Sequence, residues 1–325
     1  MLNGSQPQSG VSAKFPGSQE HQLIDAILEQ VEKVVLGKNH QIRLALACLF
    51  SEGHLLIEDL PGMGKTTLAH TLAAVLGFSF KRIQFTSDLL PVDIIGAAIF
   101  DANKQTFQFQ PGPVFSQVLL ADEINRATPK AQSALLEAME ERQVSVDGVT
   151  HPLPAPFFVI ATQNPVSQTG TFPLPESQLD RFLMRIELGY PDPRAERKMM
   201  KGSDPRRKIE QIKPVINLQQ LKSIQQKVEA IHLSEPLLDY LQRLLQFSRQ
   251  SSDFELGLSP RGALALIRSA KAWALMEGRD YVIPEDVQTV LPCVAEHRLR
   301  GGAGHSLHRG LSLTRQLIDA VDVLE

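Results

Sequence analysis

The stretch HLLIEDLPGMGKTTLAHTLAAVLG, from His54 to Gly77, joins an apolar strand to an apolar helix through a turn that contains glycines. Gly62 and Gly64 allow the backbone to bend tightly and to direct successive N–H groups at one point. The helix that begins near Lys65 adds the positive end of its dipole. These features suit a bound phosphate group, so the stretch predicts a nucleotide-binding loop.

The turn matches the P-loop pattern G-x-x-x-x-G-K-[ST] except at its first position, which holds Asp59. An acidic side chain beside phosphates is unfavourable unless it faces away. Lys65 can reach the terminal phosphates, and the Thr66 hydroxyl can ligate Mg²⁺. The alternative is an ordinary glycine turn with an exposed lysine, which the flanking strand and helix disfavour. The residues predicted to hold the nucleotide here are Pro61, Gly62, Met63, Gly64, Lys65, Thr66 and Thr67.

Composition sets the broad class of the protein. The chain has 325 residues, enough for two or three domains, and its net charge of −3 gives no electrostatic reason to expect nucleic acid. Cys48 and Cys293 are far apart, which favours reduced thiols in a cytoplasmic protein over a disulfide framework. No apolar run approaches the ~20 residues of a membrane-spanning helix. Residues 1–20 are polar, lack a signal peptide's apolar region and predict a disordered tail.

Alternating helical and apolar segments indicate an α/β core. Residues 21–51 are predicted to form two helices that are separated at Gly37. Short apolar runs follow, and helical segments separate them. Nearly continuous apolar strands between helices are typical of a parallel sheet with both faces covered. The five predicted strands are residues 54–58, 79–85, 118–122, 157–162 and 182–188.

Two segments interrupt this alternation. IFDANKQTFQFQPGP (99–113) predicts a hairpin inserted before the third strand, and QVSVDGVTHPL (143–153) predicts a hairpin that turns at Asp147-Gly148. Each can be an ordinary surface hairpin or an element that contacts a pore or a partner. The helix between the two hairpins is predicted to begin with Thr128 as its N-cap and Pro129 as its first residue.

The composition changes after Leu188. Residues 191–215 are rich in proline and charge and predict a solvated linker with one short helix. Acids are interspersed among its basic residues and no aromatics interleave, which disfavours nucleic-acid binding. The rest is predicted to be all helical, with caps at Ser234 and Ser259 and a helix start at Pro284. We therefore expect a tail (1–20), a nucleotide-binding core (21–190), a linker (191–215) and a helical lid (216–325).

Polar side chains end two of the predicted strands. VLLAD ends in Asp122, which can hold the Mg²⁺ shell with Thr66, largely through water. Because strand side chains alternate, Glu123 is expected to point the other way and to polarise an attacking water. Asn164, which follows FFVIAT, can orient that water at the same edge of the sheet. This set favours nucleotide hydrolysis over phosphoryl transfer to a small molecule.

Two arginines complete the predicted site. Arg181 lies between a short helix and the last strand, and arginine is suited to neutralise charge on a phosphoryl group in the transition state. Arg261 lies in the first turn of a lid helix, where a cation is unfavourable for the helix itself, so a bound ligand is plausible. A surface ion pair is the ordinary alternative for each arginine.

These motifs, in this order, resemble the AAA+ ATPases. EDLPGMGKTT, GPVFSQVLLADEINRA, QSALLEAMEERQVSV, ATQNP, LPESQLDRF and LSPRGALAL closely resemble the MoxR family over about residues 20–325. By position, the resemblance implies Lys65 and Thr66 in Walker A, Asp122 and Glu123 in Walker B, Asn164 as sensor 1, Arg181 as arginine finger, Arg261 as sensor 2 and Gly37 in the segment that contacts adenine. It leaves open whether Arg261 acts on the nucleotide of its own chain.

The resemblance further implies a ring-forming ATPase, expected as a hexamer, that uses ATP and Mg²⁺ and acts like a chaperone. Partners with a von Willebrand factor A domain are typical of such proteins. A DNA helicase or translocase shares this core, but no basic pore loop or DNA-binding domain is present. A scaffold that binds without turnover is disfavoured by the intact Glu123 and Arg181. A metal site made of Cys293, His297, His305 and His308 is disfavoured because their spacing matches no common zinc pattern.

Overall fold

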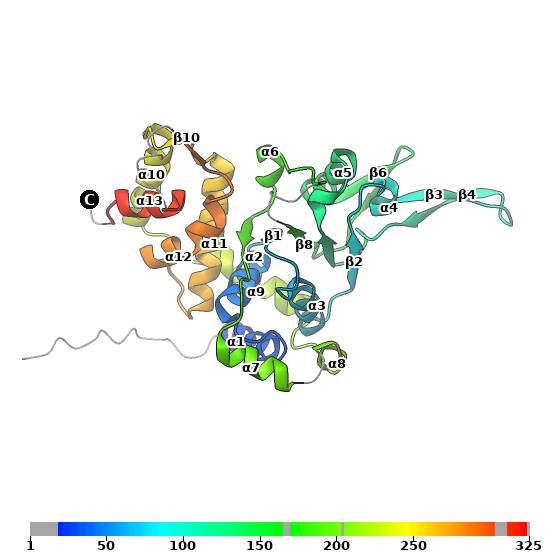
Figure 1. The fold of residues 1–325 in the computed structure, drawn as a ribbon, viewed down its shortest axis with the longest axis horizontal. Coiled ribbons are helices and arrows are strands. Elements are labelled where there is room, and N and C mark those ends of the chain that lie inside the picture. Colours follow the sequence, from blue (N-terminus) through cyan, green and yellow to red (C-terminus); the bar gives the residue numbers. More distant parts are fainter. Residues whose placement is uncertain (1–18, 165–169, 203–204, 303–310, 324–325) are drawn as a thin grey trace, which may run out of the picture.

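The computed structural model describes residues 19–164, 170–202, 205–302 and 311–323 (Figure 1). Its centre is a five-stranded parallel sheet in the order β2-β5-β8-β1-β9. The strands are β1 (Leu55–Glu58), β2 (Phe80–Gln84), β5 (Val118–Asp122), β8 (Phe158–Gln163) and β9 (Met184–Ile186). All five predicted strands are present, and the α/β fold class is confirmed.

Strand β9 is shorter than the predicted run of residues 182–188 because other groups take the flanking backbone. The carbonyls of Phe182 and Leu183 accept hydrogen bonds from Arg298 of the lid. The N–H of Leu188 donates to the carboxylate of Asp59. The first residues of the run therefore bind the lid, and its last residue binds the P-loop.

Alternating residues of the strands build two separate apolar cores. Leu55 and Leu120 face a core that includes α1 (Gln19–Glu32), α2 (Asn39–Phe50) and α3 (Lys65–Leu76). Leu56 and Leu119 face the other core with α4 (Pro91–Ile95) and α5 (Pro129–Glu141). The N-cap of α5 is Thr128, whose side chain accepts from the N–H of Ala131. The sheet is thus covered on both faces, as predicted.

Both predicted hairpins are present. Strand β3 (Gly96–Asp101) pairs with β4 (Thr106–Pro111), and β6 (Gln143–Val146) pairs with β7 (Val149–Pro152). Asp147 and Gly148 turn the second hairpin with φ of 51° and 78°, as a two-residue turn of this kind requires. Figure 1 shows β3 and β4 projecting away from the sheet. Phe100 and Phe107 lie on that projection, 52% and 72% exposed.

The segment predicted as a linker, residues 191–215, is mostly exposed and also packs on the core at a few points. It forms two helices, α7 (Pro193–Lys201) and α8 (Pro205–Glu210), where one was predicted. Ile209 and Ile216 are buried in the core that contains α3. The N–H of Val215 donates to the carbonyl of Val75 at 2.7 Å. These buried apolar residues are too few to produce a clear pattern among the charges, so the sequence indicated one short helix and not the contacts with the core.

The lid follows as a helical unit beside the core (Figure 1). Its helices are α9 (Leu218–Ala230), α10 (Glu235–Gln250), α11 (Pro260–Met276), α12 (Pro284–Ala295) and α13 (Leu313–Ala320). Ser259 caps α11 by accepting from the N–H of Gly262, whereas Ser234 occupies the N-cap of α10 without a capping bond. The lid is not all helical, because β10 (Phe254–Leu256) pairs with β11 (Arg300–Gly301) where two connecting segments run side by side.

Candidate functional site

The P-loop has the conformation that its glycines predict. Gly62 and Gly64 have φ of +87° and +90°, and a Cβ added at either would meet nothing within 4 Å. Helix α3 begins at Lys65, whose buried Nζ donates to the carbonyl of Asp59 at 2.5 Å. Burial lowers the pKa of Lys65, and the neighbouring Asp59, Asp122 and Glu123 oppose that shift. The loop therefore leaves open space beside both glycines, and the amino group of Lys65 is held against the loop backbone.

Asp59 faces away from the open side of the loop. Its Oδ2 accepts from the N–H groups of Leu188 and Gly189 at 2.8 and 2.6 Å. The Nζ of Lys38 donates to the carbonyls of the same two residues at 2.7 and 2.8 Å. The acid at the first P-loop position thus fastens the loop to the end of β9, which explains why a carboxylate is tolerated there.

Asp122 lies at the carboxyl end of β5, and its side chain is held on two sides. Its Oδ1 accepts from the hydroxyl of Thr162 at 2.6 Å. Its Oδ2 accepts from Nη2 of Arg82 at 2.6 Å, and this arginine belongs to the neighbouring strand β2. Asp122 is 8% exposed, so its carboxylate is close to fully enclosed by these partners.

Glu123 lies beside Asp122, but strand alternation does not orient it. The residue has left β5 and has φ of 57° and ψ of 50°, the left-handed region, just before the short helix η1 (Ile124–Arg126). Its Oε1 accepts from Nδ2 of Asn164 at 3.2 Å. Its Oε2 accepts from Gln84 at 3.0 Å and from Arg126 at 2.8 Å. The structure therefore brings the predicted base and the predicted sensor asparagine into contact.

Arg82, Gln84 and Arg126 were missed by the sequence reasoning. Arg82 and Gln84 are two residues apart on β2 and so share one face, and Gln84 pairs in register with Asp122. The alternation was visible in the sequence, but the order of strands in the sheet was not. Nothing in the sequence therefore indicated that these side chains meet the two acids.

Gly37 approaches the segment after β9. A Cβ added at Gly37 would lie 2.5 Å from Cβ of Ala195, and the residue has φ of +70°. Gly37, Asp192 and Lys198 are among the residues that line a cavity between α1 and α7. Glycine is required at this position by both the backbone conformation and the close contact.

The two predicted arginines lie together, away from the P-loop. Nε of Arg181 is 3.1 Å from Oε2 of Glu140, and Nη2 of Arg261 is 2.6 Å from Oε1 of the same carboxylate. Leu55 pairs with Met184, so Arg181 comes before the amino edge of the sheet, whereas Lys65 follows its carboxyl edge. The four residues of β1 alone span about 13 Å between these edges.

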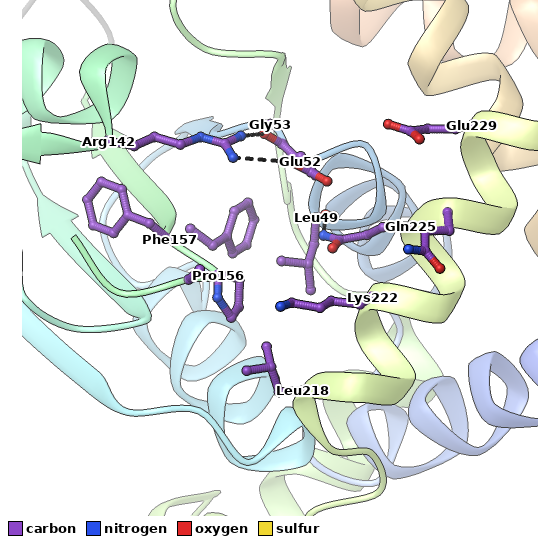
Figure 2. Close-up of a pocket in the computed structure, with 13 residues that line it drawn as sticks. Leu49, Glu52, Gly53, Arg142, Pro156, Phe157, Leu218, Lys222, Gln225 and Glu229 are labelled. Atoms are coloured by element: carbon purple, nitrogen blue, oxygen red, sulfur yellow. Dashed lines mark hydrogen bonds and ion pairs between the residues drawn. The ribbon is translucent and has the colours of Figure 1, made fainter. Parts of the chain in front are cut away.

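A groove runs along this amino edge between the core and α9 (Figure 2). Its apolar side includes Leu49, Phe157 and Leu218. At the upper rim of the groove, Arg142 forms an ion pair with Glu52, with Nη1 3.2 Å from Oε2. The same ion pair also lines the adjoining cavity that contains Arg181 and Arg261. The amino edge is therefore a charged surface with open grooves, whereas Asp122 at the carboxyl edge is enclosed by its partners.

The other predicted sites can be placed in part. His305 and His308 lie outside the described residues. Within the described ranges, no group of three or more His, Cys, Asp or Glu side chains could hold a metal ion, and Cys48 and Cys293 are free thiols. In the part of the chain that the structure describes, no helix is long and apolar enough to cross a membrane.

Comparisons with known proteins agree with this geometry. Residues 54–184 match the family model described as "ATPase family associated with various cellular activities", and residues 246–314 match that of the AAA lid domain. The chain is 43% identical to Chaperone MoxR1 of Mycobacterium tuberculosis over 86% of this chain and 76% of that protein. The chain belongs to the MoxR-type AAA ATPases.

Other relatives of this MoxR-type ATPase cover nearly its whole length. It is 44% identical to the uncharacterized protein YeaC of Bacillus subtilis, over 93% of this chain and 95% of that one. The crystal structure of a putative ATPase from Cytophaga hutchinsonii shares the fold with a TM-score of 0.83 and 37% identity, over 93% and 95% of the two chains. The predicted family and the predicted ATPase activity are confirmed.

AAA ATPases use ATP and Mg²⁺, and the residues of this chain fit both. The left-handed Gly62 and Gly64 leave free space above the P-loop, where an added Cβ would meet nothing. The carboxylate of Asp59 is turned out of that space. Thr66 is half-buried at the start of α3, and Asp122 faces the same side of the sheet as Arg82. Thr66 and Asp122 are the residues that would hold the metal ion.

Proposed function

We propose that this MoxR-type ATPase hydrolyses ATP at sites shared between neighbouring copies in a ring, expected as a hexamer. The observation that carries the proposal is the joint attachment of Arg181 and Arg261 to Glu140, at the sheet edge opposite the P-loop. In a ring built by one repeated head-to-tail contact, such an edge can face the P-loop of the next copy. Both arginines would then act on a neighbour's nucleotide.

Within one chain, the carboxyl edge supplies binding and water activation. Lys65 and the backbone N–H groups from Gly62 to Thr67, which follow Pro61, would hold the phosphates, and the Gly37 segment would contact adenine. Bound Mg²⁺ would neutralise phosphate charge. Glu123 would accept a proton from water, and Asn164, already in contact with it, would orient that water.

We also propose that the free energy of ATP hydrolysis is used to change the structure of a partner protein. Similarity to a relative named a chaperone supports a role in remodelling or maturing a protein complex. The family resemblance adds a partner with a von Willebrand factor A domain. Exposed Phe100 and Phe107 on the projecting hairpin offer an apolar contact surface for such a partner. In this scheme the core (21–190) and the lid (216–325) are the two working parts.

A trapping experiment tests the partner role. Glu123→Gln should bind ATP without hydrolysing it, so that a partner engaged in the ATP state stays bound and can be recovered with the tagged variant. Lys65→Ala is the matched control, because it should not hold the nucleotide. Recovery of the same proteins with both variants, or of none with either, would contradict nucleotide-dependent remodelling.

A further inference from the structure

Arg298, three residues after α12, is a buried lid residue that binds the core. Its side chain is 4% exposed, and its guanidinium has five N–H donors. Nε donates to Oδ1 of Asp180 at 2.6 Å, and Nη2 donates to the carbonyls of Asp180 and Phe182 at 3.1 and 2.6 Å. Nη1 donates to the carbonyl of Leu183 at 3.2 Å and to that of Val294. Four of these five contacts go to the segment 180–183, and a further contact of 2.8 Å joins Nη1 to Nε2 of His297.

That segment carries Arg181 at its second position. Arg298 therefore holds the carbonyls on both sides of the predicted arginine finger without touching its side chain. Only a planar guanidinium can address so many oxygens at fixed angles, and lysine has no equivalent geometry. The position of the Arg181 backbone is thus set by a side chain from the lid.

Arg298 also packs against the first turn of α11, which carries Arg261. A Cβ added at Gly262 would lie 3.2 Å from Cδ of Arg298, so the first turn of α11 rests on the arginine stem. Arg261 is the preceding residue, and its Nη1 lies 3.7 Å from Oδ2 of Asp180. One buried lid side chain therefore contacts both the segment that carries Arg181 and the helix turn that carries Arg261.

Stability alone does not account for this arrangement. Burying a guanidinium costs desolvation free energy that its ion pair roughly returns, and well-packed apolar residues are often as stable. Unlike an apolar side chain, a buried arginine whose donors are all engaged fixes the relative positions of the two elements that it joins. Here those two elements carry the two arginines that the proposed shared site requires.

We propose that Arg298 is a positioning residue for ATP hydrolysis, which sets Arg181 and Arg261 as one unit and couples the orientation of the lid to Arg181. The inference rests on the shared site proposed above. Arg298 would act only on the chain that donates the arginines. The P-loop and Glu123 of the same chain would not depend on it.

Arg298→Gln tests the role in turnover. We expect kcat to fall on the order of 10²-fold, as for a catalytic group displaced by about 1 Å, with the Kd for ATP unchanged. The matched control is Arg279→Gln, which removes another lid arginine (12% exposed) that pairs with Asp286 and has no contact with residues 180–183. It should keep kcat within a few-fold. Equal kcat losses in the two variants would mean that Arg298 only stabilises the lid.

Mixtures of variants separate positioning from general damage. The reference pair, Arg181→Ala with Glu123→Gln, should recover activity because one chain supplies the P-loop and Glu123 and the other supplies the arginines. Arg298→Gln should recover equally with Glu123→Gln, since the partner's arginines are intact. It should not recover with Arg181→Ala, because neither chain then presents a competent arginine.

The outcomes discriminate between the two proposals. If the reference pair recovers and Arg298→Gln is restored by both partners or by neither, the positioning role is wrong. If the reference pair itself stays inactive after confirmed subunit exchange, the shared site is wrong, and the role of Arg298 falls with it. Should Arg298→Gln fail to fold, Asp180→Asn keeps the side-chain shape, weakens the same contact and must give the same asymmetric pattern.

Discussion

The two edges of the central sheet differ in how fully their charged side chains are paired. At the carboxyl edge, the predicted charged groups have partners within the same edge: Lys65 donates to a loop carbonyl, Asp122 accepts from Arg82, and Glu123 accepts from Asn164. At the amino edge, three arginines converge on only two acids. These groups are Arg181, Arg261, Arg298, Glu140 and Asp180.

This difference supports the proposed division of the nucleotide site between two copies. The carboxyl edge has the residues to which we assign nucleotide binding and water activation. The amino edge has surplus positive charge that no acid of the cluster balances, and the lid holds it in place. In the proposed mechanism, these cations lie on the wrong edge for the P-loop of their own chain, and a second copy supplies them.

The largest expected effect belongs to the carboxyl edge. Glu123→Gln should lower turnover by at least ~10²-fold, the loss typical of a missing general base, while ATP binding is retained. Lys65→Ala should instead weaken ATP binding, because it removes the positive side chain of the loop. Fluorescent-nucleotide binding and steady-state hydrolysis of both variants would separate the two roles, and an equal loss of affinity in both would exclude Glu123 as the base.

Acid should weaken the amino edge in particular. Burial lowers the pKa of His54 to about 4 and that of His297 well below its usual value, and both rings contact carbonyls at this edge. The folded state needs both rings neutral, so their contribution is full above about pH 6.5 and is lost as the pH falls. For His54 alone the loss between pH 7 and pH 5 is about 2 kcal/mol.

Urea unfolding at several pH values would measure this loss. His54→Gln cannot titrate, so its unfolding free energy should depend less on pH over the same range, whatever its stability at pH 7. An unchanged pH dependence in His54→Gln would show that this ring is not held neutral in the fold.

At the carboxyl edge, the attachment of the P-loop should matter for stability. Asp59→Ala leaves the N–H groups of Leu188 and Gly189 without their acceptor, which costs about 1–3 kcal/mol. Each kcal/mol corresponds to a Tm decrease of about 2–4 °C in a domain of about 150–250 residues, the range into which the predicted core (21–190) falls. Asp59→Asn retains one acceptor oxygen and should lose less. Equal Tm values for Asp59→Ala and the unaltered protein would contradict the role of this carboxylate.

The smallest expected effect concerns DNA. The surplus arginines of the amino edge could be mistaken for a nucleic-acid surface, but the chain carries a net charge of −3. Single- or double-stranded DNA at physiological salt should leave the ATPase rate unchanged. A strong stimulation that falls as salt rises would favour a helicase or translocase over a protein-remodelling ATPase.

Much of the carboxyl edge could be predicted because its groups lie in contiguous motifs. The residues from Pro61 to Thr67 are adjacent in the chain, and Asp122 and Glu123 end one strand. Parallel strands bring such ends to one edge whatever their order, so Asn164 could be placed there as well. The geometry of Glu123 was misjudged, because a left-handed turn and not strand alternation sets its direction.

The amino edge could not be assembled from the sequence. Arg181 and Arg261 were singled out by position, but Glu140 and Arg298 join them only through the packing of the lid on the core. Arg298 stands among charged and apolar neighbours with no spacing that marks it as buried. Contacts between residues more than 100 positions apart depend on tertiary structure that no local pattern encodes.

The central claim, that two copies complete each site, is tested most directly by mixing Arg181→Ala and Glu123→Gln chains over a series of ratios. Each chain alone should be nearly inactive. With random assembly and independent sites, activity should peak at equal mixing, where on the order of a quarter of the interfaces are complete. If every ratio remains as inactive as the separate variants, although subunit exchange is confirmed, Arg181 does not act on a neighbour's nucleotide and the shared site is wrong.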